Sequence, residues 1–282
     1  MHKIVEDIYS KLDHLNDGSL DISEEDLDTL GDNIKKAIKS WANPEKKEGF
    51  YLRMSNVGRP ARRLWYDKRT ESGGERISPE VFIKFLYGHI LEEVILTLVR
   101  MAGHEVTDEQ KEVELEGLKG HIDCKINGRV VDIKTASGFS FKKFSEGTLH
   151  QDDPFGYMMQ LSSYEEAEGT SNGGFLALNK ETGALAMYNP GPLVKPNATV
   201  TIQNLKEKLE NDTPPERCYD PVAEGKKGNL RLSSGCAYCP HKKECWSDSN
   251  NGTGLKAFKY SNGLKYFTRV ISQPRVEEVF LH

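Results

Sequence analysis

The sequence of 282 residues lacks the features that define several whole classes of protein. No apolar run approaches the length that spans a bilayer, and the acidic stretch 1–30 has no signal-peptide pattern. It has no internal repeat and no low-complexity tract. Positive charge is not in excess either, because 43 Asp and Glu outnumber 38 Lys and Arg and give a net charge of -5. We therefore expect a cytoplasmic protein without membrane contact, in which any contact with nucleic acid comes from a local patch.

Cysteine is scarce as well, with five residues in the chain, an odd number. Four of them lie between positions 218 and 245, which is unlike a disulfide framework. Cys236, Cys239 and Cys245 are separated by two and then five residues, and Cys218 precedes them. Thiolates at this spacing form a knuckle that suits a tetrahedral metal ion or an iron–sulfur cluster. The fifth cysteine, Cys124, is expected to be a small apolar residue of the core.

The overall composition is that of an ordinary soluble protein, since 37% of the residues are hydrophobic and 29% are charged. Residues 1–45 repeat apolar positions at helical spacing and predict two short amphipathic helices, a solvated arm that packs on the main domain. A long helix is predicted between Pro79 and Gly103, with Glu92 at the edge of its apolar stripe. The further predicted elements are a strand at 111–117, a strand pair at 174–179 and 184–188, and helices at 157–167 and 202–209.

The stretch 120–135 predicts a β-hairpin, because Asn127-Gly128 is the strongest two-residue turn signal. This turn sets the register so that Asp123 lies directly opposite Asp132. Opposed carboxylates repel each other, and a purely structural hairpin would avoid this pairing. A divalent cation between the two carboxylates removes the repulsion.

Glu92, Asp123 and Asp132 are thus three carboxylates from three separate elements, and the backbone carbonyl of Ile133 adds a further oxygen. Oxygen ligands of this kind suit Mg²⁺ or Mn²⁺ and are poor for zinc. Period-two alternation puts Lys134 on the same face as Asp132. There Lys134 could orient and deprotonate a water, or stabilise the charge on a pentacovalent phosphorus. The set predicts metal-assisted phosphodiester hydrolysis, and the alternative is a surface hairpin with scattered charges.

The segment 53–66 mixes arginines, Arg59, Arg62 and Arg63 among them, with aromatic residues and a glycine-containing turn. Such a segment can hold phosphates through bidentate guanidinium contacts and stack bases on its rings. The alternative is a basic surface loop that balances the acidic remainder of the chain.

Together these motifs resemble those of the PD-(D/E)xK nuclease superfamily, in its RecB-like exonuclease branch. The motifs that carry the resemblance are Asp123, Asp132-Ile133-Lys134, the helix-face pair Gln160-x-x-x-Tyr164, and Gly88-His89-Ile90-Leu91-Glu92-Glu93, in which Glu92 stands at the branch's metal-ligand position. Residues 55–66 also resemble the first motif of the branch, which favours DNA contact by Arg59, Arg62 and Arg63. The resemblance runs from about residue 50 to 246. Phage recombination exonucleases and the iron–sulfur nucleases of CRISPR adaptation are similar members.

The resemblance implies an α/β fold with a restriction-endonuclease-like core, a mixed central sheet flanked by helices in the order α-β-β-β-α-β. We expect a helical N-terminal arm at 1–48, a nuclease core at 49–210, and a Cys-rich lobe with a C-terminal strand tail at 211–282. The implied activity is that of a Mg²⁺- or Mn²⁺-dependent deoxyribonuclease. It would be an exonuclease of recombination, repair or phage DNA processing in a bacterium or a phage-infected host. Gln160 and Tyr164 would position the DNA backbone near the metal.

Iron–sulfur members of the branch place their first cysteine in the arginine-rich segment, where this chain has Pro60. Cys218 would then supply the fourth thiolate beside the three cysteines of the knuckle. A 4Fe-4S cluster is expected there, and the alternative is Zn²⁺ held by all four thiolates or by three of them with His241. Either group would staple the C-terminal lobe and take no part in the reaction.

Two other functions stay open at this point. One is a nucleic-acid-binding or assembly module that keeps the fold without turnover. The other is a structure-selective endonuclease, which would share the site and differ in the shape of its DNA channel. In each case DNA is the expected partner, with a recombination protein as a further one.

Overall fold

The structure is a computed structural model that describes residues 3–44, 49–70 and 79–281. It divides into two compact units, which we call the first and the second unit. The first unit comprises residues 1–58 and 77–204, and the second comprises 59–76 and 205–282. The stretch 41–49, which contains Pro44 and Gly49, predicts a linker that lies in part outside the described residues, since 45–48 are not among them.

A five-stranded mixed sheet forms the centre of the first unit. Its strands run in the order β1 (Val106–Thr107), β4 (Cys124–Ile126), β5 (Arg129–Ala136), β6 (Gly174–Asn179) and β7 (Leu185–Tyr188). The β5–β6 pair is parallel, and the other three pairs are antiparallel. The parallel pair requires a crossover, which is made by the helices between β5 and β6. This is a mixed α/β architecture, as the sequence predicted.

The β4–β5 hairpin has the predicted register. Asn127 and Gly128 have φ values of 50° and 74°, as a type I′ turn requires, and Ile126 pairs with Arg129. Counting back along the ladder places Asp123 one residue before β4, at the level of Asp132 on the neighbouring strand.

Residues 111–121 form a second hairpin that the sequence analysis did not separate from the first. Strand β2 (Glu112–Leu115) pairs with β3 (Leu118–His121) in a sheet of its own, around a turn in which Glu116 and Gly117 both have positive φ. The predicted strand at 111–117 therefore ends early. Gly120 and His121 pair with β2, so the predicted 120–135 hairpin was wrong at these first two residues, while its strand at Cys124–Ile126 is present as β4. Glutamate at a left-handed position is not a turn signal, which is why this turn was missed.

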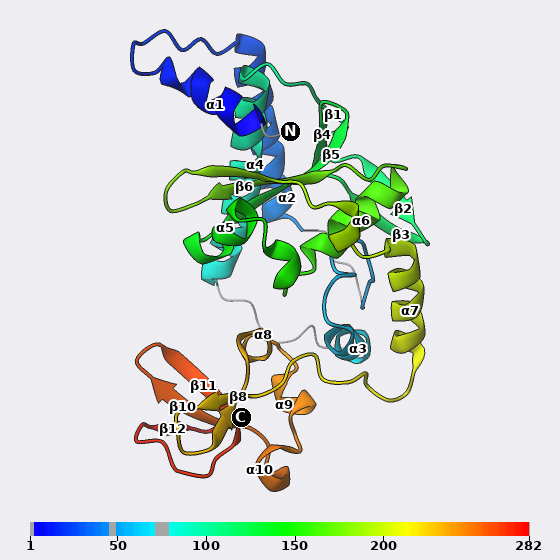
Figure 1. The fold of residues 1–282 in the computed structure, drawn as a ribbon, viewed down its shortest axis with the longest axis vertical. Helices are drawn as coiled ribbons and strands as arrows, with labels where there is room; N and C mark the ends of the chain where they lie inside the picture. Colours follow the sequence, from blue (N-terminus) through cyan, green and yellow to red (C-terminus); the bar gives the residue numbers. More distant parts are fainter. Residues whose placement is uncertain (1–2, 45–48, 71–78, 282) are drawn as a thin grey trace. The chain divides into compact units, whose positions relative to one another are not determined.

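Helices cover both faces of the central sheet (Figure 1). Helix α1 (Lys3–Asp13) buries Ile4 and Ile8 in a core that includes α4 (Pro79–Met101) and the strands β4 to β7. Helix α2 (Glu24–Ala42) packs against α4, and its N-terminus is capped by Ser23. The N-terminal segment does form the two predicted helices, but α1 is part of the core of the first unit.

The opposite face of the sheet carries α5 (Gly138–Ser145) and α6 (Tyr157–Ala167), drawn below the strands in Figure 1. Phe144 of α5 packs edge-on against Phe175 of β6, which stacks on Tyr188 of β7. The remaining elements are the 3-10 helices Leu149–Gln151 and Pro192–Val194 and the helix α7 (Ala198–Glu210), whose residues from Leu205 onward belong to the second unit. Along the chain, α4 is followed by five strands, α5, α6, β6 and β7, which is more elements than the predicted order contains.

The second unit is built on an antiparallel sheet of five short strands. Their order is β12 (Glu278–Val279), β10 (Lys256–Tyr260), β11 (Gly263–Arg269), β9 (Asn229–Arg231) and β8 (Val222–Glu224). Four helices accompany them among the described residues: α3 (Ala61–Arg69), α8 (Ser234–Ala237), α9 (Lys242–Cys245) and α10 (Ser249–Gly252). Helix α3 thus folds with the C-terminal residues, whereas the sequence analysis had assigned it to the nuclease core.

Helix α3 is tied to the C-terminal part by side chains spread along its length. The Trp65 indole N–H donates to the Asn211 carbonyl at 2.7 Å, and Lys68 pairs with Glu210 at 2.6 Å. These partners are about 140 residues apart in the chain. A periodicity analysis cannot detect such a contact.

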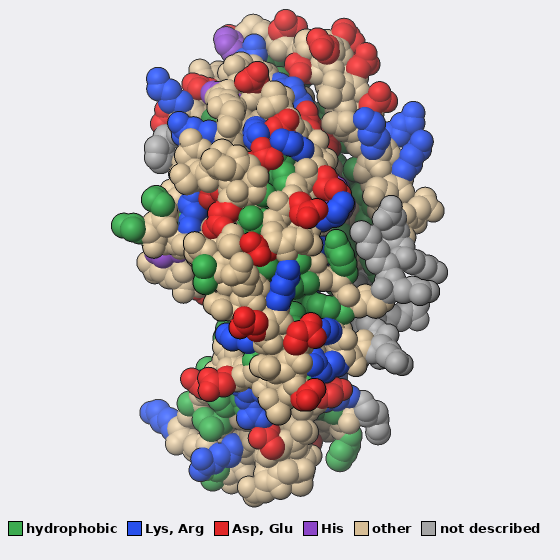
Figure 2. Space-filling view, turned by 90° about the vertical axis from the view of Figure 1, so that its right-hand side faces the viewer, with side chains coloured by type: hydrophobic (Ala, Val, Ile, Leu, Met, Phe, Trp, Pro, Cys, Tyr) green, Lys and Arg blue, Asp and Glu red, His purple; other side chains and the backbone are tan. Residues whose placement is uncertain are grey.

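None of the described helices combines the length and the apolar character that a membrane span requires. On the face shown in Figure 2, acidic and basic side chains are interspersed.

Candidate active site

Strand β5 carries the central pair of the candidate site. Asp132 is fully buried, and its Oδ2 forms an ion pair with the ammonium group of Lys134, two residues along the same strand. The two side chains share a face because side chains alternate along a strand. Val131 and Ile133 point to the other face, into the core with α1 and α4. The sequence predicted this alternation correctly.

Asp123 is held by the backbone of the neighbouring strand. Its Oδ2 accepts a hydrogen bond of 2.7 Å from the N–H of Ile133. This N–H needs a partner because β4 begins only at Cys124 and the ladder does not reach Ile133. The N–H and C=O of one strand residue point to the same side, so the Ile133 carbonyl also faces the side of Asp123. The predicted role of that carbonyl as a ligand is thus compatible with the backbone direction.

Glu92 comes from α4 and is half-buried, as its place at the edge of the apolar stripe predicts. Its Oε1 accepts a hydrogen bond of 2.8 Å from the Gln110 side chain. The next residue, Glu93, points elsewhere and accepts a hydrogen bond of 3.0 Å from Asn33 of α2.

The three carboxyl groups influence one another strongly. Burial raises the pKa of Glu92 to about 9, helped by the charges of Asp123, Glu93 and Asp132. Burial also raises the pKa of Asp132 to about 7, and the charge of Asp123 adds to this while Lys134 opposes it. For Asp123, burial raises the pKa, while Lys134 and the Ile133 N–H act in the opposite direction. The structure therefore brings the three predicted carboxylates into one electrostatic group.

Lys134 is the cation of this group. Burial by itself would lower the pKa of its ammonium, but Asp132 and Asp123 outweigh burial and the pKa is raised. Lys134 is therefore protonated at neutral pH. Its Nζ also lies 4.9 Å from the centre of the Tyr157 ring, a cation–π distance.

The oxygen-rich group fits a divalent cation. Asp132 Oδ1 is buried and has no hydrogen-bond partner among the described residues. A buried carboxylate oxygen is costly to leave unpaired, and a cation would satisfy it while also relieving the repulsion among the carboxylates. Within the described part of the chain, no three His, Cys, Asp or Glu side chains already stand in a metal-holding arrangement. The fit thus rests on the donor chemistry and the charge of the group.

Gln160 and Tyr164 lie one turn apart on α6, as predicted. The Gln160 amide Nε2 donates a hydrogen bond of 2.9 Å to the Tyr164 hydroxyl oxygen. Tyr164 is buried, and a Cβ added at Gly120 would lie 2.8 Å from its ring. Burial is the main cause that raises the pKa of Tyr164, and the negative charge of Asp132 raises it further. The hydroxyl therefore lies within electrostatic range of Asp132 and Asp123.

Three residues of the site were missed by the sequence analysis. Tyr157 faces Lys134, Gln110 donates to Glu92, and Asp153 adds to the charge that raises the Asp132 pKa. Asp153 also accepts the N–H groups of Gly156 and Met158 at 3.0 and 2.8 Å, which fixes the start of α6. An Asp shortly before a predicted helix is a recognised start signal and could have indicated it.

The four C-terminal cysteines form a separate group in the second unit. Each thiol has an N–H donor: the backbone of Arg62 and Arg63 for Cys218, the Trp246 side chain for Cys236, the backbone of His241 for Cys239, and Arg62 Nε for Cys245 at 3.1 Å. The thiols also act on one another electrostatically, which adds to the burial that raises the pKa of Cys218, Cys236 and Cys239. N–H donors to sulfur are typical of cysteine-ligated metal centres.

His241 is placed as a metal-binding histidine often is. Its Nε2 lies 2.6 Å from Asp67 Oδ1, and its ring stacks on Tyr66 at 5.5 Å. A carboxylate on one ring nitrogen leaves the other, Nδ1, for a metal. Cys124 is fully buried in the core of the first unit, as the sequence predicted.

The three arginines predicted to bind DNA belong to the second unit. The guanidinium of Arg62 already has hydrogen-bond partners within that unit, because it donates to Cys245 and, at 2.5 Å, to the Pro215 carbonyl. Arg63 Nε lies 3.9 Å from Asp67, and its charge lowers the pKa of Cys239. Arg59 is half-buried. Arg62 therefore serves the cysteine group in this structure.

No protein-family model matches the chain, and no curated protein sequence matches it. The solved structures that match the chain include that of SSO0001, which is 19% identical, covers 74% of this chain and 91% of its own, and has a TM-score of 0.40. Another is the alkaline exonuclease LHK-Exo from Laribacter hongkongensis, 13% identical over 61% of this chain and 92% of its own, with a TM-score of 0.41. Its complex with dAMP covers 56% of this chain and 92% of its own at 13% identity and a TM-score of 0.35.

Proposed function

We propose that the chain is a Mg²⁺- or Mn²⁺-dependent deoxyribonuclease that acts as an exonuclease. The observation that carries the proposal is the coupled group of Glu92, Asp123 and Asp132 around Lys134, with a buried Asp132 oxygen that lacks a partner among the described residues. Carboxylates held close enough to raise one another's pKa are costly for a purely structural sheet. The close carboxylates are explained if they bind a divalent cation that contacts the phosphodiester of the substrate.

Glu92, Asp123 and Asp132 would hold the cation, with the Ile133 carbonyl as a further oxygen ligand. A bound divalent cation supplies Lewis-acid polarisation of a phosphoryl oxygen and a water of lowered pKa. The hydrogen bond from the Ile133 N–H fixes the Asp123 carboxylate, and the Gln110 amide fixes that of Glu92. These contacts orient the ligands before substrate arrives, which lowers the reorganisation needed during reaction.

Lys134 would stabilise the negative charge that develops on the phosphoryl oxygens. Its raised pKa favours this role over proton abstraction, because the ammonium has no lone pair to accept a proton. The Tyr157 ring and Asp132 hold it from two sides. Tyr164 accepts from Gln160, so its own O–H is left to donate to a phosphate oxygen or a water. The pair would position the scissile phosphate.

The cysteine group would hold a 4Fe-4S cluster or, as the alternative, Zn²⁺. Arg62 would offset the negative charge of the thiolates, and the bound group would tie α3 to the C-terminal residues. The reaction would take place in the first unit, and its setting would be recombination, repair or phage DNA processing in the cytoplasm of a bacterium or a phage-infected host.

The test is cleavage of end-labelled single- and double-stranded DNA by anaerobically purified protein, with and without Mg²⁺ or Mn²⁺. Metal-dependent release of mononucleotides from an end is expected. Asp132→Ala and Lys134→Ala should each lose at least about a hundredfold in rate. Lys143→Ala is the matched control, because Lys143 lies on α5 and pairs with Asp152. Undiminished cleavage by both site variants would contradict the proposal, and internal cuts would indicate an endonuclease. Binding without cleavage would indicate a module without turnover.

A further inference from the structure

The two units carry opposite net charges, although the chain as a whole is acidic. The second unit has 19 Lys and Arg against 13 Asp and Glu, and the first has 19 against 30. The net charges are therefore +6 and -11, which together give the -5 of the chain. A basic unit in an acidic protein is the local patch that contact with a polyanion requires.

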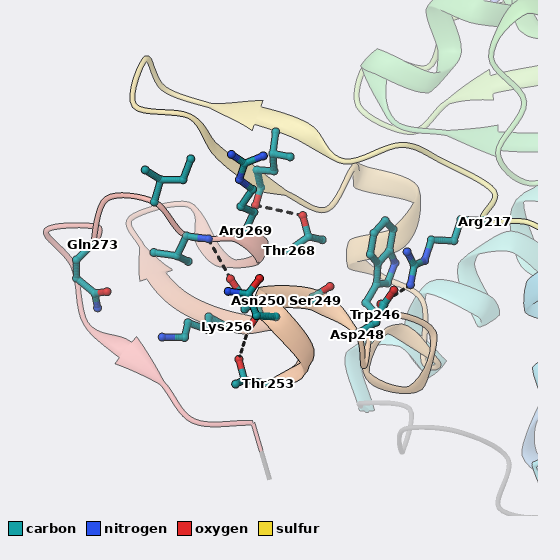
Figure 3. Close-up of a pocket in the computed structure, with 14 residues that line it drawn as sticks. Arg217, Trp246, Asp248, Ser249, Asn250, Thr253, Lys256, Thr268, Arg269 and Gln273 are labelled. Atoms are coloured by element: carbon teal, nitrogen blue, oxygen red, sulfur yellow. Dashed lines mark hydrogen bonds and ion pairs between the residues drawn. The ribbon is translucent and has the colours of Figure 1, made fainter.

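The sheet of the second unit borders a broad hollow of about 880 Å³, shown in Figure 3. Three cations line it, from three separate segments: Arg217 before β8, Lys256 at the start of β10, and Arg269 at the end of β11. Among the described residues that line it, Asp248 is the only acidic one. Asn250 and Thr253 are among the neutral polar groups that line the rest.

The hollow is held open by a fixed framework. The Asn250 side chain donates to the carbonyls of Gly254 and Phe267 at 2.8 and 3.0 Å and accepts from the Val270 N–H at 3.0 Å. This joins α10 and the residues that follow it to the end of β11. Because one side chain bridges both segments, the hollow keeps its shape without a ligand.

The three cations differ in how strongly they already interact with acidic or aromatic side chains. The Arg217 guanidinium lies 4.0 Å from the centre of the buried Trp246 ring and pairs with Asp248 at 2.5 Å. Lys256 is 3.9 Å from Glu278, at the outer limit of an ion pair. Arg269 is exposed, and no ion-pair partner for it lies within the described part of the chain. Lys256 and Arg269 are therefore the cations with the most charge left for an incoming anion.

We propose that this hollow binds the phosphodiester backbone of a single DNA strand. Its volume is on the scale of small-ligand pockets, about 300–1,000 Å³, so it suits a few nucleotides of one strand rather than a duplex. Lys256 and Arg269 contact phosphates, and the neutral polar residues accommodate any base. The only tryptophan of the lining is buried beneath Arg217, so contact is electrostatic rather than by base stacking. The choice of DNA as the polyanion rests on the proposed function.

The experiment measures binding of a fluorescent single-stranded oligonucleotide by anisotropy, as a function of salt. It uses full-length protein carrying Asp132→Ala, so that no strand is cut. Onto this are added Lys256→Glu with Arg269→Glu, or the matched pair Lys259→Glu with Arg275→Glu. Lys259 and Arg275 are exposed, carry the same charges and lie outside the lining. Lys256→Gln with Arg269→Gln serves as a milder version, and circular dichroism checks that each variant folds.

The hollow variant should bind about tenfold more weakly, and its slope of log affinity against log salt should fall by about 1.4, or about 0.7 for each lost phosphate contact. The matched pair should stay within about twofold of the parent. Equal weakening by both pairs, or none, would overturn the proposal, as would a loss confined to duplex DNA. The outcome is separate from that of the nuclease assay: a wild-type protein that does not cut DNA could still bind through the hollow, and an active nuclease could bind elsewhere.

Discussion

Lys134 and Asp132 form an ion pair within a single strand, and Asp132 is completely buried. Two opposite charges two residues apart on a strand lie side by side on one face of the sheet. Each needs the other, because a buried charge without a partner costs several kcal/mol. The pair is therefore a structural unit as well as a candidate catalytic one, and its two roles can be measured separately.

The first prediction concerns stability. Lys134→Met should lower the free energy of unfolding at pH 8 by about 3 kcal/mol, because it leaves the Asp132 charge buried and unpaired. The double variant Asp132→Leu with Lys134→Met should recover most of that loss, since it leaves neither charge. Urea denaturation of the three proteins measures both quantities. If the double variant is as unstable as the single one, the ion pair does not satisfy the Asp132 charge.

The second prediction concerns pH. The folded-state pKa values of about 9 for Glu92 and about 7 for Asp132 exceed their ordinary values of 4.5 and 3.8. The folded protein therefore binds more protons than the unfolded chain between about pH 4 and pH 9, and the free energy of unfolding falls as the pH rises through that window. Without added Mg²⁺ or Mn²⁺, the melting temperature should fall from pH 5 to pH 9.

Glu92→Gln should flatten this pH dependence, since the amide does not titrate. Glu105→Gln is the matched control, because Glu105 is an exposed glutamate of the same unit. Melting curves at five pH values compare the three proteins. A slope in Glu92→Gln equal to that of the wild type would show that Glu92 does not titrate as its environment suggests.

The third prediction concerns the cysteine group. Protein purified without oxygen should contain iron and sulfide and absorb visible light, and Cys236→Ala or Cys245→Ala should abolish both. Cys124→Ala, which changes the same residue type in the core of the first unit, should leave metal content and spectrum unchanged. Colourless protein with stoichiometric zinc would favour the Zn²⁺ alternative. Protein that binds neither metal would contradict a metal centre at these cysteines.

The fourth prediction separates the two roles open to Arg62. Because its Nε–H donates to Cys245 and its guanidinium also reaches the Pro215 carbonyl, Arg62→Ala should release the bound metal or cluster faster under chelator challenge. Arg62→Lys keeps the charge without the planar donor and should give an intermediate rate. Visible absorbance or released metal, followed over time, measures this. A normal release rate combined with weakened DNA binding would restore the role that the sequence predicted.

Much of the first unit could be predicted from local signals. The turn at Asn127-Gly128 fixed a register, and period-two alternation then separated Asp132 and Lys134 from Val131 and Ile133. The helical wheel placed Glu92 at the edge of its stripe, half-buried as found. These features depend on neighbours within a few residues, which a sequence displays directly.

The features that were missed depend on distant parts of the chain. The place of α3 in the second unit follows from contacts such as Arg62 with Cys245, which are 183 residues apart. The separate β2–β3 hairpin depends on Glu116, which has a positive φ. Glutamate rarely adopts this left-handed conformation, so its presence in the sequence does not predict a turn. Residues 205–282 alone carry a net charge of +3, and the assignment of residues 59–76 to the same unit raises it to +6.

The central claim is that the carboxylates of the first unit hold a divalent cation. The most direct measurement is the Mn²⁺-dependent shift in melting temperature at pH 8 of the wild type, Asp123→Asn and Asp132→Asn, with exposed Asp28→Asn as the control. A cation that binds only the folded state raises the melting temperature by an amount that grows with the logarithm of its concentration above Kd. We predict a rise of several degrees in the wild type and the control that is largely lost in the two site variants. An equal rise in all four proteins, or none in any, would contradict the account.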